Sequence, residues 1–295
     1  MRILVTGGTG FVGSRIVDRL KPVHDVVLLE RDASGHHAPE GVSSLVGDVT
    51  DAASLAGKLV GFDVVIHLVA IIEEHGGATF DGVIRQGTEN IVAAARAAGV
   101  PRFIHMSAIG VKDDPAYPYH QAKWKAEQAV MSSGLEWTIF RPSVIFGKGD
   151  GFVTVLAGVV RQFPITPIAG SGDARFQPVW VDDVADCFMR AVDDPDFTDG
   201  QVYELGGGKH YTYEQMIDAI ARQLGVKRPR VHIPLPVMKA VVAASGPLPM
   251  ALRPPVTSEQ LKMLSLDNTA AGSATGELIG REPVALEDGI GYLTA

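Results

Sequence analysis

The chain is poor in cysteine and in positive charge, and each scarcity excludes a class of protein. Its 295 residues contain one cysteine, Cys187, so no disulfide can form within the chain and we expect a reducing, cytoplasmic location. Cys187 lies in a helical pattern, where a buried apolar side chain is expected rather than a nucleophile. Lysine and arginine number 26 against 34 aspartates and glutamates, and the net charge of −8 predicts no nucleic-acid partner.

Uninterrupted apolar runs of membrane-spanning length are also missing. Glycines interrupt the N-terminal apolar run almost at once, so we expect no secretory signal there. The apolar stretch at residues 231–255 is broken by prolines, among them Pro234 and Pro247, and carries Lys239. This composition predicts no transmembrane helix, and it leaves open an amphipathic surface that lies on a membrane or on a partner.

Apolar runs alternate with helical patterns over the first half of the chain. Strands are predicted for the runs at residues 2–7, 25–30, 43–49, 63–70, 102–108 and 136–143. Helical patterns lie between these strands, at residues 11–20, 51–60, 79–99 and 119–134. Continuously apolar strands separated by helices indicate a parallel sheet covered on both faces, and right-handed crossovers then give an α/β, doubly wound, Rossmann-like fold.

The regular alternation fails after Ser143, and helical patterns dominate from Tyr213 onward. We therefore expect a main domain and a smaller, mostly helical domain on the C-terminal side. The strand-like residues 176–181 and 201–207 are expected to return to the main sheet. The predicted domains comprise residues 1–145 plus about 176–208 for the main one, and about 146–175 and 209–295 for the smaller one, on the substrate side.

Three glycines, Gly7, Gly10 and Gly13, follow the first predicted strand and open the first predicted helix. In such a turn the first glycine supplies a positive φ, the second lets the backbone approach a pyrophosphate, and the third lets the helix pack closely. The helix N-terminus then presents N–H groups and its positive dipole end to the phosphates. Glu30 ends the next strand 17 residues after Gly13. A plain tight turn is the alternative, but this context predicts that the main domain binds a dinucleotide.

Further motifs follow the glycine turn in a fixed order over roughly residues 1–190: "GDVTD", "VVIHLVA", "GTENIVAAARAAGV", Tyr119-x-x-x-Lys123, "RPSVIFG" and "VDDVA". With them the chain resembles the extended and atypical short-chain dehydrogenase/reductases, of the NAD-dependent epimerase/dehydratase type. Within this family, "FIHMSAIG", "FRPSVIFGKGDGF" and "ARFQPVWVDDVA" are most similar to bacterial relatives of the NAD(P)H-binding accessory subunit of respiratory complex I.

The resemblance implies which residues contact the cofactor. Asp48 would hold the adenine amino group, with a helix cap as its alternative role. The end of the fourth strand would flank the ribose and the nicotinamide. The implied contacts are Gly7, Thr9, Gly10, Phe11, Val12, Gly13, Glu30, Arg31, Asp48, Val49, Leu68, Val69, Ala70, Ser107, Tyr119, Lys123, Pro142 and Val144.

Two adjacent residues bear on the choice between NAD(H) and NADP(H). Glu30 lies where a carboxylate can accept from both ribose hydroxyls, which favours NAD and repels a 2′-phosphate. Arg31 follows at once, and its guanidinium could pair with that phosphate. A carboxylate against a phosphate costs more than an arginine lying on adenine, so we expect NAD(H). A solvated strand end is the alternative for both.

Tyr119 and Lys123 are one helical turn apart and share a helix face. An ammonium beside a phenol is expected to lower the pKa of the phenol, so that Tyr119 can exchange a proton with a substrate oxygen. The resemblance implies the same pairing, with Lys123 also holding the nicotinamide ribose. A surface tyrosine is the alternative.

Two further catalytic or substrate candidates depart from the family pattern by one residue. Ala108 stands at the place of the usual serine, and Ser107 stands one residue early, which in a strand changes the face. Phe176 stands where sugar-nucleotide enzymes often place a diphosphate-binding arginine, and Arg175 precedes it. A sugar nucleotide is therefore not the expected substrate, and Arg175 remains a candidate anion site. Arg85 replaces an asparagine that many extended members carry.

The remaining polar candidates receive structural interpretations. Asp183 is expected to cap a helix. His67 and His105 lie inside strand patterns without metal-ligand spacing, and packed core histidines are expected, with no metal.

Two functions are compatible with these features. The first is an NAD(P)-dependent oxidoreductase or epimerase-like enzyme with Tyr119 as acid/base, acting on a small carbonyl or alcohol, and the Tyr119–Lys123 pair favours it. The second is a non-catalytic nucleotide-binding protein with a structural, assembly or redox-sensing role, which the displaced Ser107 and Arg175 favour. A membrane complex or a homo-oligomer is a further expected association.

Overall fold

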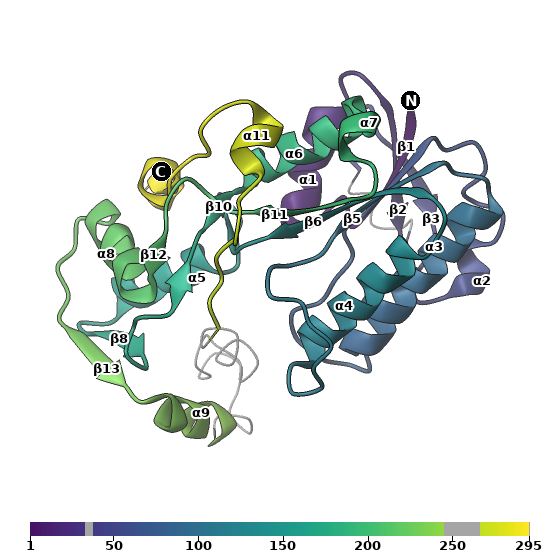
Figure 1. Ribbon diagram of the computed structural model, residues 1–295. Helices are drawn as coiled ribbons and strands as arrows, with labels where there is room; N and C mark the ends of the chain where they lie inside the picture. The colour runs from purple at the N-terminus through teal and green to yellow at the C-terminus, as the bar shows by residue number, and fades with distance from the viewer. Residues whose placement is uncertain (33–37, 245–265, 295) are drawn as a thin grey trace. The chain divides into compact units, whose positions relative to one another are not determined.

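The computed structural model describes residues 1–32, 38–244 and 266–294, which form two compact units (Figure 1). The first unit comprises Met1–Pro142, Val181–Leu205 and Ser273–Arg281. The second comprises Ser143–Trp180, Gly206–Gly272 and Glu282–Ala295.

A seven-stranded parallel sheet lies at the centre of the first unit, in the order β11-β6-β5-β4-β1-β2-β3. The order reverses at β1, and in such sheets ligands bind at the carboxyl ends of the strands beside this point. The predicted doubly wound fold is confirmed. The strands are β1 Arg2–Thr6, β2 Asp25–Glu30, β3 Ser43–Val46, β4 Val64–His67, β5 Arg102–Met106, β6 Glu136–Pro142 and β11 Gln201–Leu205.

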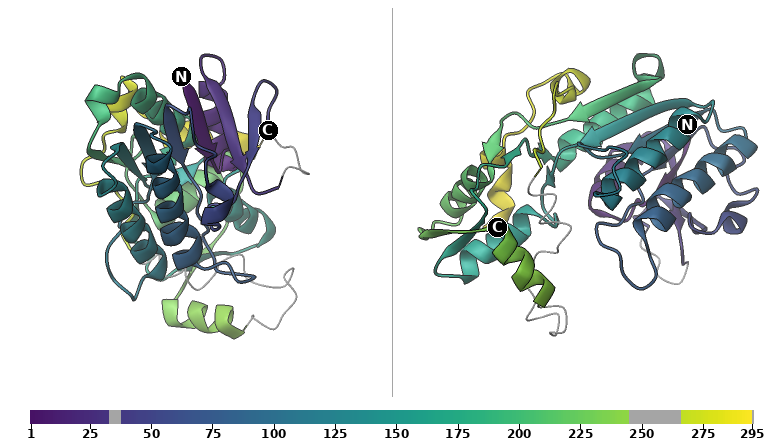
Figure 2. Two further views of the ribbon diagram at one scale, coloured as in Figure 1. Left: turned by 90° about the vertical axis from the view of Figure 1, so that its right-hand side faces the viewer. Right: turned by 60° about the horizontal axis from the view of Figure 1, so that its bottom comes forward.

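Helices cover both faces of this sheet, as Figures 1 and 2 show. Helix α6 packs against both α1 and α11 on one face, and α3 packs against α2 and α4 on the other. Apolar side chains of α1, such as Ile16 and Leu20, are fully buried because they recur on one helix face. The helices of the first unit are α1 Phe11–Leu20, α2 Ala52–Leu55, α3 Gly87–Ala97, α4 Pro118–Met131, α6 Val181–Asp193, α7 Pro195–Thr198 and α11 Thr275–Ile279.

Two of the predicted helices differ in the structure. The helix expected over residues 51–60 is too long, because α2 ends at Leu55 and Gly57 adopts a φ of 71° that a helix cannot continue through. The helix expected over residues 79–99 begins as a π-helix, Asp81–Gln86, which runs directly into α3.

The described residues of the second unit form helices and three two-stranded sheets. Residues 201–207 were expected to return to the main sheet, and β11 does so, but the same expectation for residues 176–181 is wrong. These residues form two short strands that pair within the second unit, β9 with β12 and β10 with β7. Pro178 separates them because it has no N–H to donate to a ladder. The elements are β7 Ile145–Phe146, α5 Val153–Gln162, β8 Thr166–Ala169, β9 Arg175–Phe176, β10 Val179–Trp180, β12 Tyr211–Thr212, α8 Tyr213–Gln223, β13 Arg230–Ile233, α9 Leu235–Ala244, α12 Leu286–Gly289 and a 3₁₀ turn Ile290–Leu293.

The apolar stretch 231–255 lies partly within the described residues. Its first half forms β13 and α9, where Val237 and Val241 are exposed, and residues 245–255 lie outside the described part. Over the described residues, the helices are all too short or too polar to cross a bilayer.

Candidate functional site

The glycine turn joins β1 to α1 at the point where the strand order reverses. Gly7 has a φ of 73°, which a residue with a side chain rarely adopts. The N–H of Gly10 donates to the carbonyl of Gly7 at 3.1 Å and closes the turn. A Cβ on Gly7 would lie 3.3 Å from backbone atoms of Leu68 and Val69, so the turn lies directly against the end of β4.

Close contacts explain why each of the other positions in this turn is occupied by glycine. A Cβ on Gly13 would lie 2.1 Å from the carbonyl oxygen of Gly7, so the first turn of α1 packs on the backbone of the glycine turn. A Cβ on Gly10 would meet only the Gly7 carbonyl, at 3.2 Å, among the described residues, and Gly10 is exposed. At Gly8, for which the glycine spacing predicts no role, a Cβ would lie 2.5 Å from the Leu28 side chain.

These contacts leave the N-terminus of α1 suited to an anion. Thr9 and Gly10 are exposed, Phe11 is half-buried, and Val12 faces the core. No acidic residue lies in the first turn of α1. Amide N–H groups and the positive end of the helix dipole therefore meet no negative side chain of that turn, which suits a pyrophosphate.

Glu30 ends β2 beside the neighbouring strand β3, and its carboxylate accepts a hydrogen bond from the hydroxyl of Ser44. Glu30 is half-buried, whereas Arg31 is exposed. The contact limits the orientations of the carboxylate. The sequence around Ser44 carries no signal of this contact, because only strand pairing brings Ser44 next to Glu30.

Asp48 lies in the loop after β3 and organises that loop. Its Oδ1 accepts from both the N–H and the hydroxyl of Thr50, each at 2.8 Å. The helix-cap alternative for Asp48 is wrong, because Asp51 is the N-cap of α2 and accepts from the N–H of Ala53 at 3.0 Å. Val49 beside Asp48 is buried.

Lys123 projects from α4 to the carboxyl end of β5. Its ammonium donates to the carbonyl of Met106 at 2.7 Å, and the side chain is 1% exposed. Burial lowers the pKa of Lys123 to about 8, and the nearby carboxylate of Glu127 partly offsets this effect. An ammonium that is buried this deeply needs a specific polar partner in place of solvent.

Ser107 follows Met106 directly at the end of β5. Its N–H donates to the carbonyl of Phe140 at 2.7 Å, and its side chain is buried, whereas Ala108 is partly exposed. Among the described residues, the hydroxyl of Ser107 has no hydrogen-bond partner. Buried hydroxyls normally have one, so this hydroxyl is a candidate ligand contact.

Tyr119 lies one turn before Lys123 on α4, yet its surroundings differ from the expected ones. The ring is half-buried and packs edge-on against Phe80, with centroids 5.7 Å apart. The expectation that an ammonium lowers the pKa of Tyr119 is wrong for this structure. Burial raises that pKa to about 12, and the Lys123 ammonium is bonded to Met106 instead.

Replacing Lys123 with methionine is expected to change how stability depends on pH. The pKa of Lys123 falls from 10.5 to about 8 on folding. Between these values the unfolded chain binds the proton that the folded chain lacks, so the wild type gains stability as pH rises. Relative to Lys123→Met, the gain is roughly 2–3 kcal/mol, since each pKa unit corresponds to about 1.4 kcal/mol. Urea unfolding of both proteins from pH 7 to pH 10.5 measures this gain. A difference in the free energy of unfolding between the two proteins that stays constant over this pH range would contradict the prediction.

His67 and His105 are core residues, as expected. Both rings are buried and stack with centroids 5.5 Å apart and planes 17° apart. Cys187 is also fully buried, which raises its pKa and leaves the thiol unreactive. Within the described ranges, the histidines, cysteine and carboxylates form no cluster able to hold a metal ion.

Arg85 and Asp183 take part in ion pairs. Arg85 bonds both oxygens of Asp81, at 2.6 and 2.7 Å, and one oxygen of Glu89 at 2.7 Å. The expectation that Asp183 caps a helix is wrong, because Asp183 lies inside the first turn of α6 and its buried carboxylate pairs with Arg281 at 2.7 Å.

The other predicted contacts are divided between the two units. Pro142 ends β6 in the first unit, and its carbonyl accepts from Ile109 N–H at 3.1 Å. Val144 belongs to the second unit, where its N–H donates to Oδ1 of Asn268 at 2.7 Å. Arg175 also lies there and is exposed, because alternation along β9 turns Phe176 into the core instead.

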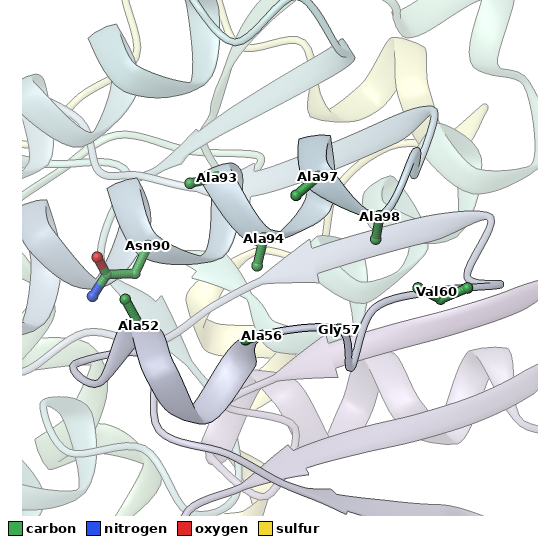
Figure 3. A pocket seen from close by; sticks show the side chains of 9 residues that line it. All are labelled: Ala52, Ala56, Gly57, Val60, Asn90, Ala93, Ala94, Ala97 and Ala98. Carbon is green, nitrogen blue, oxygen red and sulfur yellow. The ribbon is translucent and has the colours of Figure 1, made fainter.

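An apolar pocket of about 180 Å³ lies elsewhere on the first unit, between α2 and α3 (Figure 3). Small side chains line it, and Figure 3 shows them on the two facing segments. Asn90 is the one polar lining residue, and its amide donates to the carbonyl of Val49 at 2.8 Å. The pocket therefore offers no charged group to a phosphate.

A model of an NAD(P)H-binding family matches residues 7–195. The chain is 27% identical over 285 residues to the mitochondrial NADH dehydrogenase (ubiquinone) 1 alpha subcomplex subunit 9 of Arabidopsis thaliana, covering 92% of this chain and 71% of that protein. It is 30% identical over 270 residues to a 3-beta-hydroxysteroid dehydrogenase of Mycolicibacterium neoaurum, covering 79% and 72%.

Two solved structures have the same fold at lower identity. A nucleoside-diphosphate-sugar epimerase from Staphylococcus aureus matches with a TM-score of 0.77 at 19% identity and covers 100% of both chains. A dTDP-glucose 4,6-dehydratase from Streptomyces venezuelae, solved with NAD bound, matches with a TM-score of 0.74 at 22% identity, covering 99% of this chain and 95% of that one.

Proposed function

The chain belongs to the NAD(P)H-binding family of epimerase/dehydratase-like oxidoreductases, and on that premise we propose that it transfers hydride between the nicotinamide and a carbonyl or alcohol substrate. The match to the family model confirms the family that the motif order predicted, and it confirms NAD(P)H as the cofactor. The substrate and the roles of individual residues are our proposal. The observation that carries it lies at the carboxyl end of β5: the buried ammonium of Lys123 is bonded to the carbonyl of Met106, and the buried hydroxyl of the next residue, Ser107, has no hydrogen-bond partner within the described part of the chain.

Different residues of the first unit would bind different parts of the dinucleotide. Gly10 and the N-terminus of α1 would hold the pyrophosphate, because no side chain of the described residues fills the space beside Gly10 and the helix end is positive. Glu30 would accept from the ribose hydroxyls and Asp48 would accept from the adenine amino group. Leu68–Ala70 would form the wall beside the ribose and the nicotinamide.

The chemistry would involve three side chains around the reacting oxygen. The nicotinamide supplies or accepts the hydride when it is bound. In reduction, the Tyr119 phenol would donate its proton to the oxygen of the substrate carbonyl as the carbon receives the hydride, and Ser107 would donate a hydrogen bond to the same oxygen. In oxidation, Tyr119 would accept that proton. For Lys123 to assist, its ammonium must exchange the Met106 carbonyl for the ribose and the phenolate.

A second function, nucleotide binding without catalysis, is supported by a specific observation. Tyr119 packs on Phe80 with its pKa raised to about 12, and Lys123 is bonded to the backbone, so the acid/base pair is not assembled here. Subunit 9 of the Arabidopsis NADH dehydrogenase, a named relative, is a subunit of a larger complex. A screen of carbonyls and alcohols that follows the absorbance of reduced nicotinamide separates the two: turnover supports the enzyme, and binding without turnover supports the second function.

Glu30→Ala is expected to narrow the difference in affinity between NADH and NADPH. The carboxylate favours NADH by accepting from the ribose and repels a 2′-phosphate, so the variant is expected to bind NADH about tenfold more weakly and NADPH more tightly. Ser44→Ala is the matched control, because it removes only the hydrogen bond that orients Glu30, and a smaller change in the same direction is expected. Fluorescence titration measures both affinities. A wild type that prefers NADPH would mean that Arg31 dominates.

A further inference from the structure

A hydrogen-bond chain that the proposed chemistry does not use passes through His67, the last residue of β4. Its Nδ1 lies 2.7 Å from the hydroxyl of Thr6, and its Nε2 lies 3.1 Å from the hydroxyl of Thr88. All three side chains are fully buried. The hydrogen-bond chain thus runs from β1 through β4 to α3.

The partners of each hydroxyl determine where the protons are. Thr88 donates its proton to the carbonyl of Ile84 at 2.6 Å, so it accepts from His67, and Nε2 carries the ring proton. Nδ1 is then an acceptor and receives the proton of Thr6, whose oxygen accepts from the N–H of Leu68 at 3.3 Å. Burial keeps the ring neutral by lowering the pKa of His67 to about 3, with the charge of Lys123 as the smaller cause.

One end of this chain lies at the glycine turn. Thr6 directly precedes Gly7, and the N–H of Leu68 is shared between the carbonyl of Thr6 at 3.2 Å and its hydroxyl. The backbone of Leu68 and Val69 in turn lies 3.3 Å from a Cβ position on Gly7. The hydroxyl of Thr6 therefore joins the two backbone segments that meet at Gly7.

We propose that His67 is a positioning residue for the dinucleotide site, holding the hydroxyl of Thr6 so that the glycine turn and Leu68–Ala70 keep a fixed separation. The inference rests on the proposed function, because it takes these two segments as walls of that site. The ring itself is held from the other side by its bond to Thr88 and by the stacked ring of His105.

Three variants of His67 separate its hydrogen bond to Thr6 from its hydrogen bond to Thr88. His67→Asn keeps an acceptor near the position of Nδ1, toward Thr6, and loses the donor to Thr88. His67→Gln extends a donor toward Thr88 and loses the acceptor for Thr6. His67→Phe keeps a ring and loses both. Since Asn and Gln each remove one buried hydrogen bond, similar losses of thermal stability are expected for them.

Titration of NADH into the wild type and the variants tests the inference. His67→Gln and His67→Phe are expected to bind about tenfold more weakly, the effect of one lost buried hydrogen bond, and His67→Asn within about threefold of wild type. A purely structural role would make the affinity follow melting temperature instead, with Asn and Gln alike, and that result would overturn the inference. A wild type that fails to bind NADH would instead contradict the dinucleotide site on which the inference rests, and turnover of a carbonyl or alcohol by the wild type tests the proposed function separately.

Nitrogen-15 NMR of the His67 ring supplies a second readout that needs no nucleotide. A pyrrole-type shift for Nε2 and a pyridine-type shift for Nδ1 are expected at neutral pH, and Thr6→Val is expected to perturb the Nδ1 shift more than the Nε2 shift. The opposite tautomer, or a charged ring, would overturn the assignment of His67 as the acceptor for Thr6.

Discussion

Turnover of Tyr119→Phe is expected to fall about 100- to 10,000-fold for whichever carbonyl or alcohol the wild type converts, since general acid–base catalysis contributes that much. The ring of phenylalanine keeps the edge contact with Phe80, so the variant is expected to fold normally. Affinity for NADH is expected to stay within about threefold, because the phenol serves the reacting oxygen and not the phosphates.

The pH dependence of the wild type supplies a further check on Tyr119. With its pKa at about 12, the phenol is protonated at neutral pH and ready to donate a proton in reduction. Oxidation of an alcohol needs the phenolate, so its rate is expected to increase as the pH rises above neutrality. Tyr117→Phe is the matched control two residues earlier, at the N-cap of α4, where the Lys112 ammonium lies over the ring, and it is expected to keep wild-type turnover. Unchanged turnover in Tyr119→Phe would remove this mechanism and favour the non-catalytic function.

Gly13→Ala is expected to abolish measurable NADH binding and to lower the free energy of unfolding by at least about 2 kcal/mol. The new Cβ would lie 2.1 Å from the Gly7 carbonyl oxygen and 2.7 Å from the Cα of Gly8, both backbone atoms that cannot rotate away. Helix α1 must then move off the glycine turn, and the N–H groups at its start move with it.

The same substitution at Gly158 is the matched control. Gly158 lies in the middle of α5, where a Cβ would meet no described atom within 4 Å outside the backbone of its own helix. Gly158→Ala is expected to raise the free energy of unfolding by about 0.5–1 kcal/mol, because alanine favours the helix. Urea unfolding and NADH titration of both variants measure the difference. A Gly13→Ala protein that is as stable as wild type and binds NADH would contradict the role of the turn.

Local patterns account for the features that the sequence predicted well. The glycine turn and the parallel strands depend on backbone freedom and on apolar runs a few residues long, and both are visible in a single stretch of chain. The sequence places Asp48 correctly after the third strand, but the alternative role of Asp48 as a helix cap is wrong, since the cap depends on which of two nearby aspartates starts the helix.

Contacts between distant segments account for what the sequence could not predict. The bond from Ser44 to Glu30 depends on strand pairing, and the chain through His67 needs Thr6 and Thr88 from two other elements. The sequence places Lys123 near Tyr119 and so predicts a lowered pKa for Tyr119, but burial of the phenol raises that pKa.

Mapping the bound nucleotide by amide NMR is the most direct test of the account. With NADH added to deuterated, nitrogen-15-labelled protein, the largest shifts are expected for the amides of Gly7–Gly13, with further shifts at Asp48 and Leu68–Ala70. The apolar pocket between α2 and α3, lined by Ala93 and Ala97 among others, is expected to stay unchanged (Figure 3). Shifts confined to that pocket, with the glycine turn unaffected, would contradict the account.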